Sequence, residues 1–64
     1  MTPQAQKVLR RLKAGRAITP MEALRDFGCF RLSARIYEIR RSGHHVINTW
    51  QVAGRKRFAR YRLV

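Results

Sequence analysis

The 64-residue sequence predicts an α+β fold in one domain, residues 1–64, with three short helices followed by a C-terminal β-hairpin. Two Thr-Pro pairs, at residues 2–3 and 19–20, are typical helix starts, and a glycine follows each helical apolar repeat. After Gly43 the spacing changes to β-branched and aromatic runs, "HVINTWQV" and "RFARYRLV", joined by "AGRK". A chain this short buries only about 60% of its unfolded surface, so we expect nearly every apolar side chain to pack.

The first helix is predicted over residues 3–14, with Thr2 as N-cap and Pro3 as its first residue. Its apolar stripe follows the i, i+3, i+4, i+7 spacing of one buried face and comprises Ala5, Val8, Leu9 and Leu12. The basic residues around it are interpreted as a solvated face: Lys7, Arg10, Arg11, Lys13 and, just beyond the helix, Arg16.

The second helix is predicted over residues 20–27, because Thr19 can cap it and Glu22 is placed to complete a capping box. Gly28 can adopt the left-handed conformation that ends a helix. We expect an apolar side made of Met21, Ala23, Leu24 and Phe27. Ile18, just before the cap, is expected to pack on Ala23 or Leu24.

The third helix is predicted over residues 31–42, with Leu32, Ile36 and Ile39 as its buried stripe and Gly43 after its end. Only two or three residues around Gly28 and Cys29 separate it from the second helix, which indicates a tight helix-turn-helix crossing. We expect Cys29 to be buried. Phe30 is expected to pack as well, with contact to DNA as the alternative.

The hairpin is predicted over residues 45–63. In its second arm Ala59, Tyr61 and Leu63 alternate with Phe58, Arg60 and Arg62, which predicts one face on the helices and one face exposed. The first arm alternates less clearly. We expect Ile47 to point inward, and Trp50 is left open between a core anchor and a cross-strand partner of Phe58.

This order of elements is that of a winged helix-turn-helix, in which the third helix enters the major groove. Projection at 100° per residue away from Leu32 gives the groove-facing candidates. They are Arg31, Ser33, Arg35, Tyr37 and Arg41. Arginine can bond bidentately to guanine O6 and N7, whereas Glu38 could accept from cytosine N4 or form an ion pair with Arg35 or Arg41, the alternative we favour.

The formal charge of +12, with only three acidic residues, predicts a polyanionic partner, and double-stranded DNA is the partner we expect. The hairpin loop and its second arm provide a second basic group, interpreted as phosphate-binding: Arg55, Lys56, Arg57 and Arg60.

The stretch "ITPMEALRDFGCFRLSARIYEIRRSGHHVINTW", continued by "RFARYRL", resembles a family of small winged helix-turn-helix domains common in phage and prophage genomes. The resemblance covers nearly the whole chain. It is most specific in the "ITPMEAL" helix start, the "FGCFRLSARI" turn and third helix, and the "ARYRL" strand. It implies DNA binding without naming an operator.

Other classes of function have little support in the sequence. Three carboxylates and the adjacent His44 and His45 provide no catalytic or metal-binding group, so we expect no enzyme and no cofactor. A single cysteine excludes an intrachain disulfide and suits a reducing compartment. No apolar run has the length of a signal peptide or a membrane span, so we expect a soluble cytoplasmic protein without a membrane partner.

The sequence therefore predicts a sequence-selective duplex-binding transcription regulator of a phage or prophage. Three alternatives remain: an architectural or excisionase-like recombination factor; a module that stacks RNA bases on Tyr37, Trp50 and Phe58; and a basic protein that blocks a host protein. No segment for a small-molecule effector is evident, and a homodimer on DNA is left open.

Overall fold

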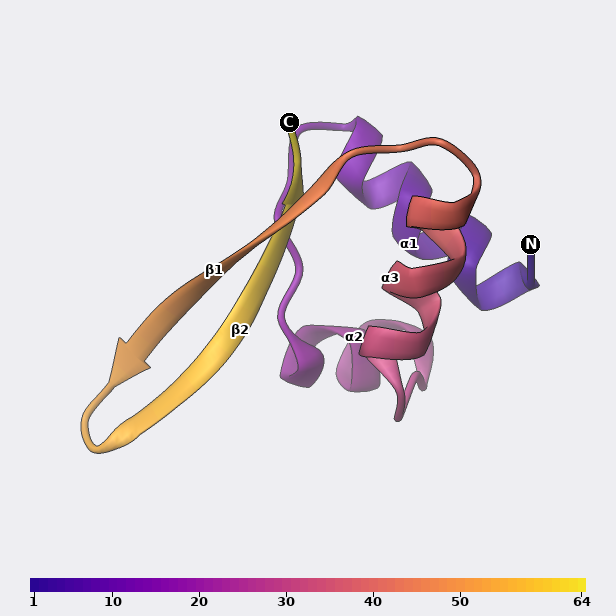
Figure 1. The fold of residues 1–64 in the computed structure, drawn as a ribbon. Helices are drawn as coiled ribbons and strands as arrows, with labels where there is room; N and C mark the ends of the chain where they lie inside the picture. The colour runs from indigo at the N-terminus through magenta and orange to yellow at the C-terminus, as the bar shows by residue number, and fades with distance from the viewer.

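The computed structural model describes all residues 1–64, as three helices and one antiparallel hairpin. The elements are α1 Pro3–Lys13, α2 Pro20–Phe27, α3 Leu32–Arg41, β1 Val46–Ala53 and β2 Lys56–Leu63. Relative to the sequence-based bounds, α1 ends one residue early, α3 is one residue shorter at each end, and the hairpin begins one residue later. In Figure 1 the helices pack together and the hairpin extends away from them to a free tip.

The first two helices begin as their Thr-Pro pairs predict. The Thr2 hydroxyl accepts a hydrogen bond from the Ala5 backbone N–H at 3.2 Å. At α2 the Glu22 N–H donates to Thr19 Oγ1 and the Thr19 N–H donates to Glu22 Oε1, so the capping box is complete. Gly28 ends α2 in the left-handed conformation, at φ 62°. In contrast, α3 begins after Arg31 without a side-chain cap.

The hydrophobic core lies where the three helices meet the base of the hairpin. Its ten buried residues are Ala5, Val8, Leu12, Ile18, Ala23, Cys29, Leu32, Ile36, Ile39 and Val46. The expected stripes of α1 and α3 therefore face inward, although Leu9 is only partly buried. The expected apolar side of α2 is wrong in part: Met21 is 73% and Leu24 40% exposed. This eight-residue helix contributes only Ala23 to the buried core, with Phe27 packed at its edge.

A short backbone pairing joins the helical part to the hairpin. The Ile18 N–H donates to the Tyr61 carbonyl and the Tyr61 N–H donates to the Ile18 carbonyl, each at 2.9 Å. The Ile18 backbone lies beside β2, while its side chain is fully buried in the same core cluster as Ala23, in agreement with its expected packing against α2. The pairing places β2 between Ile18 and β1, so a residue from the α1–α2 connection holds the base of the hairpin.

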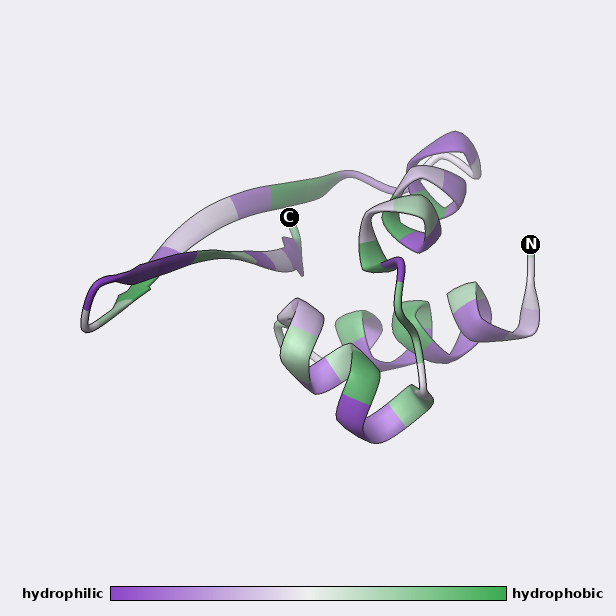
Figure 2. Cartoon of the chain, turned by 90° about the horizontal axis from the view of Figure 1, so that it is seen from below, coloured by the Kyte–Doolittle hydropathy of each residue, from purple (hydrophilic) through white to green (hydrophobic).

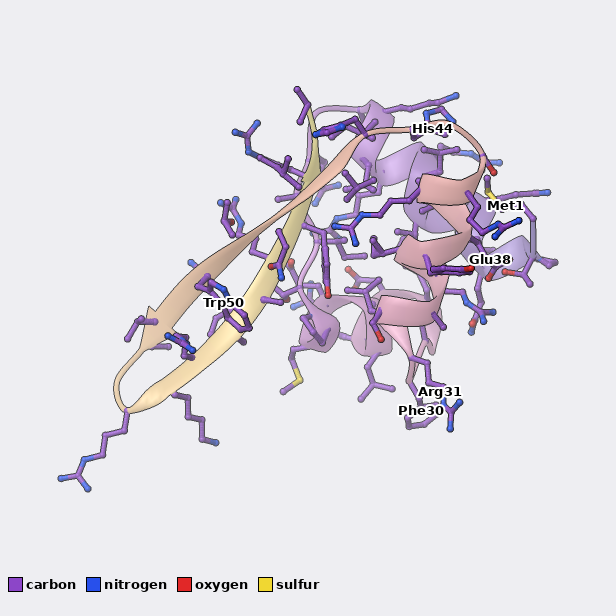
Figure 3. All side chains as sticks on the ribbon, in the orientation of Figure 1. Met1, Phe30, Arg31, Glu38, His44 and Trp50 are labelled. Atoms are coloured by element: carbon purple, nitrogen blue, oxygen red, sulfur yellow. The ribbon has the colours of Figure 1, made fainter.

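The register of the hairpin decides which side chains face the core. Val46 pairs with Leu63 and is 5% exposed, so the inward residue is Val46 and the prediction for Ile47 is wrong. Trp50 pairs with Ala59, which places it on the face opposite Phe58, and it is 59% exposed. Trp50 is therefore neither a core anchor nor a partner of Phe58. The tip half of the hairpin projects clear of the helices (Figure 2), and Trp50 lies on that half (Figure 3).

Candidate nucleic-acid interface

The tip of the hairpin is a concentrated positive surface. Arg55, Lys56 and Arg57 are all exposed there, and no Asp or Glu occurs after Glu38. The Arg57 guanidinium lies over the Trp50 ring, 4.7 Å from its centroid. Lys56 and Arg57 are consecutive residues of β2 and point to opposite faces of the hairpin, so the tip carries cations on both faces. The described geometry brings together the basic residues that the sequence assigned to phosphate contact, with Arg60 exposed further along β2.

Most of the other predicted contact residues lie on the outer face of α3 or directly before its first residue. Arg31, Ser33, Tyr37 and Arg41 are all exposed. Arg41 Nη1 donates to the Tyr37 hydroxyl at 3.2 Å, and its guanidinium lies 5.8 Å from the centre of the Tyr37 ring. The face therefore presents hydrogen-bond donors, one aromatic ring and no free carboxylate.

Arg35 lies apart from this group, against the N-terminus of α1. Its Nε is 2.9 Å from Glu38 Oε2, and its Nη1 donates to the Thr2 hydroxyl at 3.3 Å. The Nε–H is not aligned for a hydrogen bond, so its contact with Glu38 is an electrostatic one. With only 24% of its side chain exposed, Arg35 joins α3 to α1, which places it differently from the groove-facing position expected from the helical projection.

Glu38 is engaged in the same cluster. Its two carboxylate oxygens accept from the Thr2 backbone N–H at 3.0 Å and from the Thr2 hydroxyl at 3.2 Å, and Glu38 points toward the N-terminal end of the chain (Figure 3). The ion pair with Arg35, favoured from the sequence, is confirmed. Both carboxylate oxygens of Glu38 are therefore engaged within the domain.

The other two carboxylates are also paired within the helical part. Arg11 lies 3.1 Å from Glu22 and 3.0 Å from Asp26, and its Nε donates to the Ala17 carbonyl. Asp26 also pairs with Arg25 at 2.9 Å. The interpretation of Arg11 as part of a solvated face is wrong, since only 9% of its side chain is exposed. It bridges α1 and α2 instead.

A groove lies between the start of α2 and the hairpin, with a volume of about 1060 Å³. Met21 and Phe58 contribute apolar surface, while Arg16 and Arg60 contribute charge. Sequence reasoning missed this surface because it exists only where the Ile18–Tyr61 pairing brings the α1–α2 connection beside β2. Arg16 thus lies next to the hairpin and not on an isolated helix face.

The comparisons with known proteins agree with this architecture. A family model described as a winged helix-turn-helix domain matches residues 3–64. The chain belongs to this family. No curated protein and no solved structure matches the chain. In the winged helix-turn-helix arrangement, the hairpin is the wing and α3 is the recognition helix, and the fold suggests DNA binding. None of the three helices has the length and apolar character needed to cross a bilayer.

The residues directly before the recognition helix include one that the sequence analysis placed wrongly. Cys29 is buried, as expected, but Phe30 is 87% exposed, so the expectation that it packs is wrong. In Figure 3 Phe30 and Arg31 lie close together and point away from the body at the N-terminal end of α3. The wing tip and this end of α3 lie along the same edge of the domain (Figure 1).

The Glu38 cluster predicts a dependence of stability on pH. The Thr2 N–H, followed by the Thr2 hydroxyl and Arg35, holds the pKa of Glu38 below its ordinary value of 4.5, although partial desolvation opposes the shift. A lowered pKa in the folded state stabilises the fold above pH 4.5, and this contribution is lost as pH falls through the folded-state pKa. We expect Glu38→Gln to be less stable than wild type at pH 7, and the difference to shrink toward pH 3.

Urea denaturation between pH 7 and pH 3 measures this effect. Both proteins also lose some stability in acid through the other two carboxylates. Desolvation raises the pKa of Glu22, but the hydrogen bonds from Thr19 and the charge of Arg11 lower it overall, and a hydrogen bond from Arg25 lowers the pKa of Asp26. A stability difference between the two proteins that stays constant with pH would contradict the assignment of Glu38.

Proposed function

We propose that this winged helix-turn-helix protein binds double-stranded DNA sequence-selectively, with α3 in the major groove and the wing on the phosphate backbone. We further propose that it regulates transcription for a phage or prophage, in the bacterial cytoplasm. A domain this small acts most simply by occluding or marking an operator. No step of the proposal requires catalysis or a cofactor.

The observation that carries the proposal is the distribution of charge. Of fifteen Lys and Arg side chains, only Arg11, Arg25 and Arg35 pair with a carboxylate, so twelve have no acidic partner. The carboxylates lie in α2 and α3 and are all engaged, while the wing carries cations alone. Self-repulsion among these cations disfavours the compact state, and a polyanion that neutralises them relieves it. DNA phosphates also release counterions on contact with Lys and Arg, which drives association.

The recognition helix supplies groups that distinguish bases. Arg31 is exposed at the start of α3, and Ser33 and Arg41 are exposed on its outer face. Base edges in the major groove present distinct patterns of donors and acceptors, and guanine offers two acceptors to one guanidinium. The wing, in contrast, presents flexible cations that suit phosphates, which carry no sequence information.

Selection from a random duplex pool tests this function. The enriched duplex is then titrated against random duplex and matched single strand at two salt concentrations. We expect an enriched motif bound on the order of 10³-fold more tightly than random duplex. A split motif would show two copies. Preference for single strand would instead favour base stacking on the exposed Tyr37 and Trp50, and affinity that simply falls with salt would overturn sequence selectivity.

Arg31→Ala is expected to relax sequence preference. Loss of a bidentate guanine contact costs roughly 1–3 kcal/mol on the enriched duplex and much less on random duplex. Lys13→Ala is the matched control, since it removes one exposed cation from α1. The ratio of the two dissociation constants, enriched over random, should change for Arg31→Ala and stay constant for Lys13→Ala. Equal losses on both duplexes for Arg31→Ala would remove Arg31 from base recognition.

A further inference from the structure

Phe30 is the most exposed large hydrophobic side chain of the domain, at 87%. A chain of 64 residues with only ten residues in its buried hydrophobic core has little apolar surface to spare. The exposure of Phe30 therefore gains nothing for the isolated fold. It does place an aromatic ring directly beside Arg31, at the leading end of the recognition helix (Figure 3).

The local backbone holds Phe30 outward. Gly28 turns the chain at φ 62°, and the Cys29 N–H then donates to the Ala23 carbonyl at 3.1 Å. Cys29 is 2% exposed and Leu32 3% exposed, so buried anchors stand on both sides of the Phe30–Arg31 pair. These anchors hold the backbone at Phe30 in place, so that only the side chain of Phe30 has to be ordered when the ring binds, which limits the entropic cost.

We propose that Phe30 reads a thymine in the major groove by packing its ring against the C5 methyl group, a contact that rests on the proposed DNA-binding function. Apolar side chains, phenylalanine among them, recognise thymine in this way, because only thymine presents a methyl group at that edge. Arg31 reaches a neighbouring base pair from the same end of α3. The surrounding charge favours DNA over a protein as the occupant, since Arg31, the residue after Phe30, is exposed and the domain has a net charge of +12.

The test removes single methyl groups from the DNA. Each thymine of the duplex enriched by the wild type is changed to deoxyuridine, which removes the methyl group and keeps the base pair. At one position we expect the wild type to lose about fourfold in affinity, the equivalent of ~0.8 kcal/mol for one buried methyl-sized group. Phe30→Ala should bind the thymine duplex several-fold more weakly and should not distinguish it from the deoxyuridine duplex.

Two controls separate this effect from changes in folding. Phe30→Ala removes a side chain that makes almost no contact in the free domain, so its urea midpoint should match the wild type. Val64→Ala trims another exposed apolar residue, at 79%, and should keep the full deoxyuridine effect. Phe30→Leu should retain part of it, because an apolar surface remains.

The outcomes distinguish the inference from the function on which it rests. A deoxyuridine loss that disappears in Phe30→Ala supports the contact. An enriched motif without thymine, or a deoxyuridine loss of equal size in both proteins, would overturn the role of Phe30 and leave duplex recognition intact. Failure of the wild type to select any duplex would overturn the proposed function and the thymine contact together.

Discussion

Replacing Arg55, Lys56 and Arg57 together by alanine is expected to weaken binding to every duplex by roughly 500-fold at 0.1 M salt. Each phosphate contact adds about −0.9 to the slope of log K against log salt, so three contacts account for about −2.7. If these contacts contribute nothing at 1 M salt, a slope of about −2.7 over one decade makes them contribute about 500-fold to affinity at 0.1 M salt. Enriched and random duplexes should lose alike, because the contacts proposed for the wing are to the phosphate backbone, which carries no sequence information.

The control is a variant with the same change in net charge, made on α1 and not on the wing. Lys7, Arg10 and Lys13 are exposed on α1, and their triple replacement by alanine also removes three cations. If DNA follows the wing, the α1 variant should lose far less affinity and keep most of the salt slope. Titrations by fluorescence anisotropy at four or more salt concentrations give both slopes. Equal slopes for the two variants would show that net charge alone, and not the wing, determines binding.

The helices were predictable because their signals are local. Thr2-Pro3 and the Thr19–Glu22 capping box act within one turn, and the stripe of Leu32, Ile36 and Ile39 follows directly from helical spacing. The change to β-type residues after Gly43 likewise located the hairpin. A fold made of such short, locally specified elements in this order leaves few arrangements, and the family match over residues 3–64 agrees with the one expected.

The sequence did not reveal contacts between residues far apart in the chain. The residues around Ile18 carry no signal for its backbone pairing with Tyr61. The ion pair of Glu38 with Arg35 was expected, but the bonds of both side chains to Thr2 were not. Helical projection gives the direction of a side chain around the axis of α3. Whether that side chain faces solvent depends on where α1 packs against α3, which the projection does not contain.

Part of the candidate interface was therefore predictable and part was not. Composition identified the wing cations, since no acidic residue lies near them in the sequence. The exposure of Phe30 was not predictable, because a phenylalanine near a buried cysteine ordinarily packs. Only the turn at Gly28 decides that Cys29 fills the core and its neighbour points outward.

Ile18→Ala is expected to remove much of the stability of the domain. Truncating a fully buried isoleucine costs about 2–5 kcal/mol. A domain of this size has on the order of 3–10 kcal/mol in total, at about 0.05–0.15 kcal/mol per residue. The isoleucine packs where the connection, β2 and the helices meet, and an isolated two-stranded hairpin is only marginally stable. The wing should therefore lose order before the helices do.

Urea denaturation with and without duplex separates folding from binding. Val52→Ala, at a wing position 68% exposed, should stay close to the wild-type midpoint. Saturating duplex at about 100 times the dissociation constant should add roughly 2.7 kcal/mol to each protein, which restores much of the loss in Ile18→Ala. Any weaker binding of Ile18→Ala would then come from the unfolded fraction of the variant, which must fold before it can bind the duplex. Equal midpoints for Ile18→Ala and Val52→Ala would show that the buried Ile18 side chain does not support the fold, since the backbone bonds to Tyr61 are kept in the alanine variant.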